Sequence, residues 1–185
     1  MDMSIRKKCI QFLYKVATGS RKVRLLMAPL GALAFFVLMT FFVVIPWLLD
    51  AWFGVPKLIP SPYHIVISAP ILLVGITLVV WCNIRFFLAK GTPVPLSPPQ
   101  RLVEEGPYRY SRNPMVAGIF LLLLGAGIYW GSFFMLFVFT PLFIILITIE
   151  LKQIEEPELE QRLGQPYIEY KKRVPMFFPK IGKKT

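Results

Sequence analysis

Long apolar runs alternate with polar segments along this chain, and the runs predict its elements. The first run covers residues 25–49 and the second covers about 65–84. Each run is long enough to cross a hydrocarbon core of about 30 Å as a single helix. We therefore expect two spanning helices in the first half of the chain.

The third run, residues 113–149, contains 37 residues without a charge. A single helix of that length would be about 55 Å long, far more than one crossing needs. Gly125, Gly127 and Gly131–Ser132 interrupt the run. We therefore predict a hairpin of two short membrane helices, whose polar flanks return to the same membrane face. The prediction is an all-α, multi-pass membrane protein with about four spanning helices.

The segments outside these runs have patterns of their own. Residues 3–18 have apolar positions at helical spacing among basic ones, which predicts an interfacial helix that either frames a site or only sets topology. Residues 91–99 contain four prolines and predict a stiff loop, which either covers a cavity or only links elements. The last helix should continue beyond residue 149, with a kink or a new start at Pro157 and a stop at Gly164.

Composition and charge agree with a membrane protein and orient it. Hydrophobic residues make up 56% of the chain and the mean hydropathy is +0.61, which argues against an ordinary soluble domain. Seven Lys and Arg residues precede residue 25, five lie in 85–112 and eight follow residue 150. The loop between the first two runs has only Lys57. The positive-inside rule therefore predicts cytoplasmic termini and a cytoplasmic middle loop.

The net charge of +11 is explained by topology and anionic lipids, so we expect no nucleic-acid partner. Cys9 and Cys82 lack the spacing of a metal site or a redox pair, and no metal is expected. No cleavable signal peptide is expected. The expected partners are the bilayer and a lipid-like substrate, and the expected location is a prokaryotic plasma membrane. The oligomeric state stays open.

Two polar segments, residues 101–118 and 155–179, flank the predicted hairpin. Pro114 stands at the first turn of the third span, where proline is favoured. Free N–H groups at such a helix start, around Arg112 and Asn113, are expected to hold a carboxylate or phosphate. Glu155 and Glu156 follow the other end of the hairpin and would bind a cation. Together the two flanks suit a zwitterionic ligand.

The residues of these flanks form two ordered motifs. The first is Leu-Val-x-x-Gly-x-Tyr-x-x-x-Arg-x-Pro, met by Leu102, Val103, Gly106, Tyr108, Arg112 and Pro114. The second follows the Glu-Glu pair as Gly-x-x-Tyr-x-x-Tyr-Lys-Lys-Arg-Val-Pro, met by Gly164, Tyr167, Tyr170, Lys171, Lys172, Arg173, Val174 and Pro175. Over about the C-terminal 85 residues the chain resembles the isoprenylcysteine carboxyl methyltransferase family, which includes phospholipid methyltransferase-like membrane proteins.

The resemblance implies one membrane-embedded methyltransferase domain over residues 1–185 that uses S-adenosyl-L-methionine. Residues 1–24 would be its cytoplasmic interfacial segment, 25–90 its first two spans, and 91–185 its cofactor-binding loop, hairpin and tail. Arg173 and Glu156 would act as the catalytic residues that orient the substrate. The implied cofactor-binding residues are Tyr108, Arg112, Asn113, Pro114, Glu155 and Tyr167. Tyr110 and Tyr170 are expected to be interfacial belt residues instead.

The chain departs from the commonest family pattern at two positions. Asn113 stands where His is usual, and Val116 stands where Tyr is frequent. A carboxylate acceptor is already ionised at pH 7 and needs only a cation such as Arg173, whereas an amine must first lose a proton. We therefore expect a lipid-borne carboxylate, such as that of an isoprenylated cysteine. The alternatives are a phospholipid N-methyltransferase, an NADPH-dependent membrane reductase of related architecture, and a non-catalytic family member.

Overall fold

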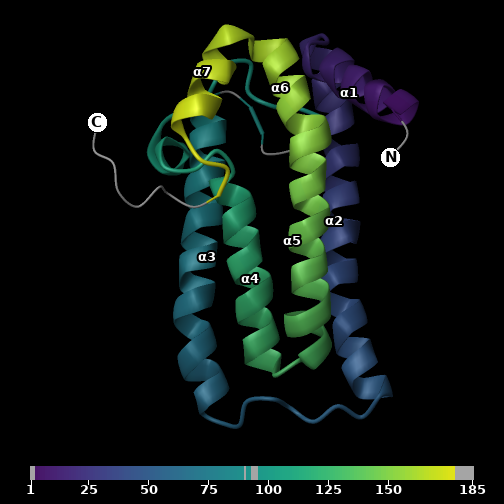
Figure 1. Ribbon diagram of the computed structural model, residues 1–185, viewed down its shortest axis with the longest axis vertical. Coiled ribbons are helices and arrows are strands. Elements are labelled where there is room, and N and C mark those ends of the chain that lie inside the picture. The colour runs from purple at the N-terminus through teal and green to yellow at the C-terminus, as the bar shows by residue number, and fades with distance from the viewer. Residues whose placement is uncertain (1–2, 90, 93–95, 178–185) are drawn as a thin grey trace. The chain divides into compact units, whose positions relative to one another are not determined.

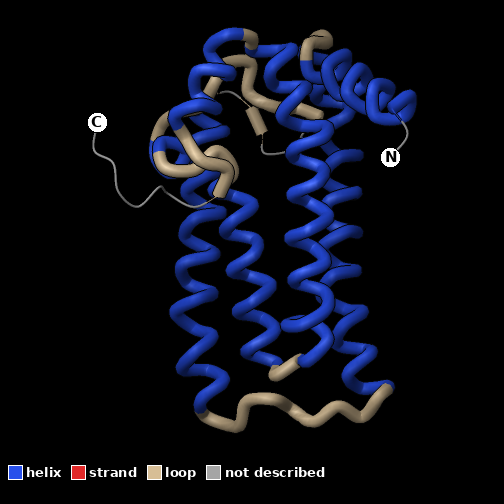
Figure 2. Tube along the Cα trace, viewed as in Figure 1, coloured by secondary structure: helices blue, strands red, loops and turns tan. Residues whose placement is uncertain are grey.

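The computed structural model describes residues 3–89, 91–92 and 96–177, and every regular element in that part of the chain is a helix (Figure 2). A short 3-10 helix, η1 (Gly106–Arg109), precedes α4, and the π-helical turns η2 (Met135–Phe139) and η3 (Leu151–Glu155) flank α5. The all-α prediction is confirmed. The α-helices are α1 (Met3–Ala17), α2 (Arg21–Trp52), α3 (Tyr63–Leu88), α4 (Pro114–Trp130), α5 (Thr140–Glu150), α6 (Glu156–Leu163) and α7 (Gln165–Arg173) (Figure 1).

Three of the helical segments are long and apolar enough to cross a membrane: Arg21–Trp52, Tyr63–Leu88 and Met135–Leu163. The fourth apolar helix is α4, whose 17 residues correspond to about 26 Å. These four helices follow the order of the predicted spans. The chain is a multi-pass helical membrane protein.

The chain forms two compact units. One, here called the polar unit, comprises Met1–Ala32, Val80–Met115 and Ile149–Thr185. The other, the apolar unit, comprises Leu33–Val79 and Val116–Thr148. The sequence of the apolar unit contains only two charged residues, Asp50 and Lys57.

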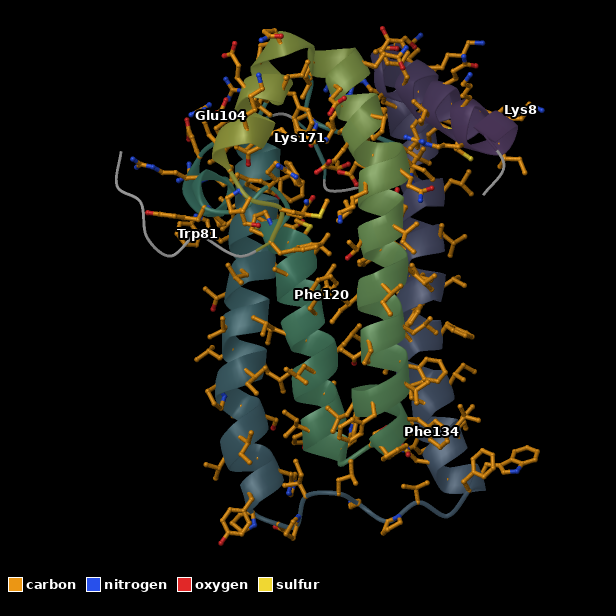
Figure 3. The ribbon with its side chains drawn as sticks, viewed as in Figure 1. Lys8, Trp81, Glu104, Phe120, Phe134 and Lys171 are labelled. Atoms are coloured by element: carbon orange, nitrogen blue, oxygen red, sulfur yellow. The ribbon has the colours of Figure 1, made fainter. Side chains whose placement is uncertain are left out.

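Aromatic rings fill the core of the apolar unit. Phe42 contacts Phe143 and Phe139 edge-on, with ring centroids 4.9 Å and 6.0 Å apart, and Ile119 and Leu123 of α4 complete the cluster. Phe120 and Phe134, labelled in Figure 3, pack against this cluster. Many other large apolar side chains of this unit are exposed, as side chains that contact lipid tails are.

Helices α3 and α4 approach each other closely at two glycines. A Cβ atom on Gly118 would lie 3.1 Å from the Gly75 carbonyl oxygen and 2.9 Å from a methyl group of Val79. Small residues at helix crossings are the usual means of close packing in membranes, where lipid tails compete equally for apolar side chains. This crossing positions α4.

The predicted hairpin is confirmed, and its turn lies at Gly131–Ser132. Gly131 has a φ of +65°, a conformation that glycine adopts without steric cost. The Ser132 hydroxyl caps the next helix by accepting the Met135 N–H at 3.1 Å. The Asp50 carboxylate accepts the Ser132 hydroxyl and the Phe134 N–H, so a buried helix start has its polar groups satisfied.

In the polar unit, α1 packs against η3 and α6, and the Arg6 Nε donates to the Gln153 carbonyl at 2.8 Å. Pro157 lies in the first turn of α6, and Gly164 ends that helix with a φ of +66°, as predicted. The predicted helix at 3–18 is confirmed as α1. In the predicted proline-rich loop, residues 91–92 and 96–99 are non-helical, and Pro93 and Pro95 lie outside the described residues.

Candidate active site

Main-chain hydrogen bonds join the segment before α4 to the segment after α7. The Arg112 N–H donates to the Pro175 carbonyl at 2.9 Å, and the Asn113 N–H donates to the Met176 carbonyl at 3.0 Å. The Ser111 hydroxyl also donates to the Met176 carbonyl, at 3.0 Å. The two predicted motifs are therefore neighbours within the polar unit, although the whole hairpin separates them in sequence.

The Arg112 guanidinium holds this junction together. Its Nη1 donates to the Lys171 carbonyl at 2.7 Å and to the Val174 carbonyl at 3.0 Å, both at the end of α7. Its Nη2 donates to Glu156 Oε1 at 2.6 Å. Its Nε is buried and has no partner among the described residues. Arginine suits this position because its planar fork serves several acceptors at once.

Glu156 is the centre of a buried ionic cluster. Its side chain is 5% exposed and pairs with Arg112 and with the Lys171 ammonium, each at 2.6 Å. Lys171 also pairs with Glu160 at 2.8 Å. Burial alone would lower the pKa of Lys171, but its hydrogen bonds to Glu156 and Glu160 outweigh this and raise the pKa. Because buried charges are costly unless paired, each member of the cluster depends on the others.

Three buried tyrosines line the same region. The Tyr170 hydroxyl donates to the Tyr108 carbonyl at 2.6 Å, and the Tyr167 ring lies 6.2 Å from that of Tyr170. Burial raises the pKa of all three phenols. Negative charge adds to the effect, from Glu155 at Tyr108 and from Glu156 at Tyr167. The phenols therefore stay protonated at neutral pH.

Glu155, the last residue of η3, differs from the acidic residues of α6. It ends the π-helical turn η3, and no ion pair or hydrogen bond engages its carboxylate within the described part of the chain. Its charged neighbours are Glu150, Glu158, Arg162 and Glu156, and it lies within electrostatic range of the Tyr108 and Tyr167 phenols. A single turn of π-helix inside an α-helix is frequent at functional sites.

Further ion pairs of the polar unit lie outside this cluster. Glu158 and Arg162 form a buried pair at 2.7 Å, with both side chains 6% exposed. The Arg162 Nη1 also donates to the Pro99 carbonyl at 2.9 Å, which fixes the proline-rich loop. Arg173 instead pairs with Glu104 near the surface at 2.9 Å and is 64% exposed; Glu104 and Lys171 are labelled in Figure 3.

The structure brings most of the predicted site residues together. Tyr108, Arg112, Glu155, Glu156 and Tyr167 are mutual neighbours in the polar unit. Pro114 begins α4, and the Asn113 side chain donates to the Met176 carbonyl at 3.4 Å. Arg173 is not part of the Glu156 cluster, since each has other partners.

Two expectations are wrong. The N–H groups of Arg112 and Asn113 are not free for an anion, because the tail carbonyls of Pro175 and Met176 occupy them. Tyr170 is not an interfacial residue, since it is only 2% exposed, whereas Tyr110 is 57% exposed.

Sequence reasoning missed Lys171 and Ser111. Helical spacing over α7 could have found Lys171, because Tyr167, Tyr170, Lys171 and Val174 share one face and Arg173 does not. No sequence pattern predicts the role of Ser111, because its hydroxyl bonds to Met176, which is close to it only in the folded chain.

The fold and the site define a polytopic helical membrane protein in which the polar segments before and after the hairpin in sequence assemble a buried charged cluster. A family model described as Phospholipid methyltransferase matches residues 63–166, more than half of the chain. The chain belongs to this family of membrane methyltransferases, which confirms the predicted resemblance. The match ends before the tyrosines of α7. Neither the curated proteins nor the solved structures contain a match to the chain.

Proposed function

We propose that this protein transfers a methyl group from S-adenosyl-L-methionine to a nucleophile carried by a membrane lipid. Membership of a methyltransferase family supports the reaction class. The observation that carries the choice of cofactor is the unpaired Glu155 carboxylate, next to a cluster in which the neighbouring Glu156 and Glu158 are both paired. An unpaired carboxylate there is best explained by a cationic ligand.

The residues present fit this cofactor. Its methionine part has an ammonium and a sulfonium, which suit Glu155, and a carboxylate, which suits the unpartnered N–H at Arg112 Nε. The protonated phenols of Tyr108 and Tyr167 offer hydrogen-bond donors on apolar rings. The sulfonium supplies an electrophilic methyl group, so the protein's part is to bind, align and exclude water.

A phospholipid amine is the acceptor that we favour. The family description points to a phospholipid headgroup. An amine must lose a proton to a nearby base before it attacks, whereas a carboxylate needs none. The acceptor would reach the site from the bilayer.

A lipid-borne carboxylate, such as that of an isoprenylated cysteine, is the second candidate. It needs no base at pH 7, and Arg173 is a largely exposed guanidinium that contacts only Glu104 among the ion pairs of the described chain. In this case Arg173 would place the carboxylate, as the family resemblance implies. Nothing specific favours the NADPH-dependent reductase.

Cofactor binding tests the proposal directly. Protein purified in micelles should bind labelled S-adenosyl-L-methionine and not NADPH. Glu155→Gln should weaken binding by about tenfold, the loss expected for one charge-assisted contact. Glu169→Gln changes an exposed glutamate of α7 and should bind normally. Binding of NADPH alone, or equal affinity in both variants, would contradict the proposal.

The acceptor is identified by mass spectrometry of host lipids and prenylated peptides incubated with isotopically labelled cofactor. Label on phosphatidylethanolamine supports the first candidate, and label on a prenylated peptide supports the second. Arg173→Ala should reduce transfer to a carboxylate, whereas His64→Ala should not. Absence of label in every lipid and peptide would support a non-catalytic member.

A further inference from the structure

An open apolar groove lies in the polar unit between α1 and the turn after α5. Its volume is about 400 Å³, and it is lined by Lys8, Cys9, Phe12, Leu13, Glu150 and Ile154. The Arg6–Gln153 hydrogen bond and the packing of α1 on η3 hold its two walls together. None of its lining residues belongs to the cluster around Glu156.

The groove has two charged side chains of opposite sign, and neither forms an ion pair with the described residues. Lys8 lies on α1 (Figure 3) and Glu150 ends α5. No ion pair or hydrogen bond involves either side chain in the ranges that the structure describes. The remaining lining is apolar apart from the Cys9 thiol. Opposite charges that share a groove without pairing are complementary to a ligand that carries both charges and an apolar chain.

One lining residue of the groove, Glu150, lies near the candidate active site. Glu150 and Glu155 bracket the π-helical turn η3, and the two carboxylates are electrostatic neighbours. A ligand ammonium held at Glu150 is therefore close to the unpaired carboxylate of Glu155.

From these observations we infer that the groove is a binding site for a zwitterionic aminophospholipid. Its phosphate contacts Lys8, its ammonium contacts Glu150, and the start of one acyl chain lies along Phe12, Leu13 and Ile154. The inference rests on the proposed function, because it makes the groove the place where the lipid waits before methyl transfer. It assigns substrate binding to α1, which the sequence left as either a site element or a topology signal.

The two cysteines allow ligand binding in the groove to be measured by thiol labelling. Cys9 lines the groove and is partly exposed, whereas Cys82 is fully buried. A thiol reagent such as N-ethylmaleimide should therefore modify Cys9 and spare Cys82. Full-length protein in micelles is labelled in the presence of increasing phosphatidylethanolamine or phosphatidylglycerol. We expect phosphatidylethanolamine to slow Cys9 labelling, and the anionic phosphatidylglycerol, which has no ammonium, to be about fivefold less effective.

Matched variants test each charge. Glu150→Gln and Lys8→Gln should each raise the half-protecting concentration of phosphatidylethanolamine about fivefold, the loss expected for one partly exposed ion pair. Lys7→Gln, an exposed residue of α1 outside the groove, and Glu169→Gln should not change it. Equal protection by the two lipids, or unchanged protection in Glu150→Gln, would overturn the inference.

Methyl transfer measured on the same preparations separates the two proposals. Lipid-specific protection of Cys9 without any transfer supports the groove and contradicts the proposed function. Transfer to phosphatidylethanolamine without protection of Cys9 supports the proposed function and overturns the groove.

Discussion

At the scale of single residues, Glu155 and Glu156 show how neighbouring carboxylates acquire different roles. Glu156 is buried and held by Arg112 and Lys171, so it is already neutralised by the protein itself. No ion pair or hydrogen bond engages the Glu155 carboxylate within the described residues, and the proposed function assigns it to the cationic cofactor. In that proposal Glu156 positions Arg112 and Lys171, and the catalytic role that the resemblance implies for Glu156 stays a prediction.

The Arg112–Glu156 pair should be a main determinant of stability. Removing one partner of a buried ion pair leaves the other charge uncompensated, at a cost of about 3–5 kcal/mol. We expect Arg112→Ala to lower the unfolding free energy in micelles by about that amount. Arg173→Ala, which removes an exposed pair, should cost at most about 1 kcal/mol. Similar losses in both variants would contradict the ionic cluster.

The raised pKa of Lys171 predicts that the folded state loses stability at alkaline pH. Its pKa is raised above the ordinary value of 10.5 by Glu156 and Glu160, despite burial. A raised pKa means that the charged form stabilises the fold fully below pH 10.5, and that this contribution is lost as the pH rises through the folded-state pKa. The difference in melting temperature between wild type and Lys171→Met should therefore be constant to about pH 10 and shrink above it.

The control for this pH dependence is Lys172→Met, an exposed neighbour with no ion pair among the described residues. Its melting temperature should follow wild type at every pH. A difference between wild type and Lys171→Met that persists unchanged to pH 12 would show that Lys171 contributes through packing and not through charge.

At the scale of elements, α3 and α4 cross at Gly75 and Gly118 within the apolar unit. The approach is close because both helices place glycine at the contact. Larger residues there must push against the Gly75 main chain, which cannot move aside as a side chain can.

Enlarging Gly118 should therefore destabilise the apolar unit. Gly118→Val places its Cβ within 2.9 Å of Val79 and adds two methyl groups beyond it, and overpacking of this kind costs about 1–3 kcal/mol. We expect a lower melting temperature in micelles. Ala34→Val makes a comparable enlargement on an exposed face of α2 and should have little effect. A Gly118 variant as stable as wild type would mean that the helices do not cross there.

The elements that sequence predicted poorly were the π-helical turns. The sequence predicts that the last helix continues past Ile149, and the structure confirms this. No sequence pattern in residues 151–155 predicts the π-helical turn η3. The turn changes the angular position of every later side chain, so periodicity counted from α5 gives the wrong faces for Glu155 and Glu156. The hairpin turn was predictable because Gly131 and Ser132 have local conformational preferences.

At the scale of the whole molecule, apolar run lengths were sufficient to predict the helices, their order and the hairpin. The motifs were sufficient to predict that the segments before α4 and around α7 meet. The partners within the site were not predictable, because Arg112 binds Glu156 and main-chain carbonyls of α7, and such choices depend on three-dimensional packing. For the same reason the sequence favours Arg173 as a site residue, whereas in the structure Lys171 is the residue that pairs with Glu156.

The positive-inside distribution predicts one orientation for the molecule, which labelling can test. We expect Cys9 to react with an impermeant maleimide only after right-side-out vesicles are opened, because the N-terminal segment should be cytoplasmic. A cysteine in place of exposed Lys57 should react in intact vesicles. The reverse pattern would place the charged site on the outer face.

The pairing of Arg112 and Asn113 with Pro175 and Met176 has a consequence for biosynthesis. The ribosome completes residues 175 and 176 only after both hairpin helices, so the segment before α4 is made before the tail segment that its N–H groups bind. At roughly 5–20 residues per second this interval lasts several seconds. A chain truncated before Pro175 would keep its apolar helices and lack the pairing that joins the two motifs.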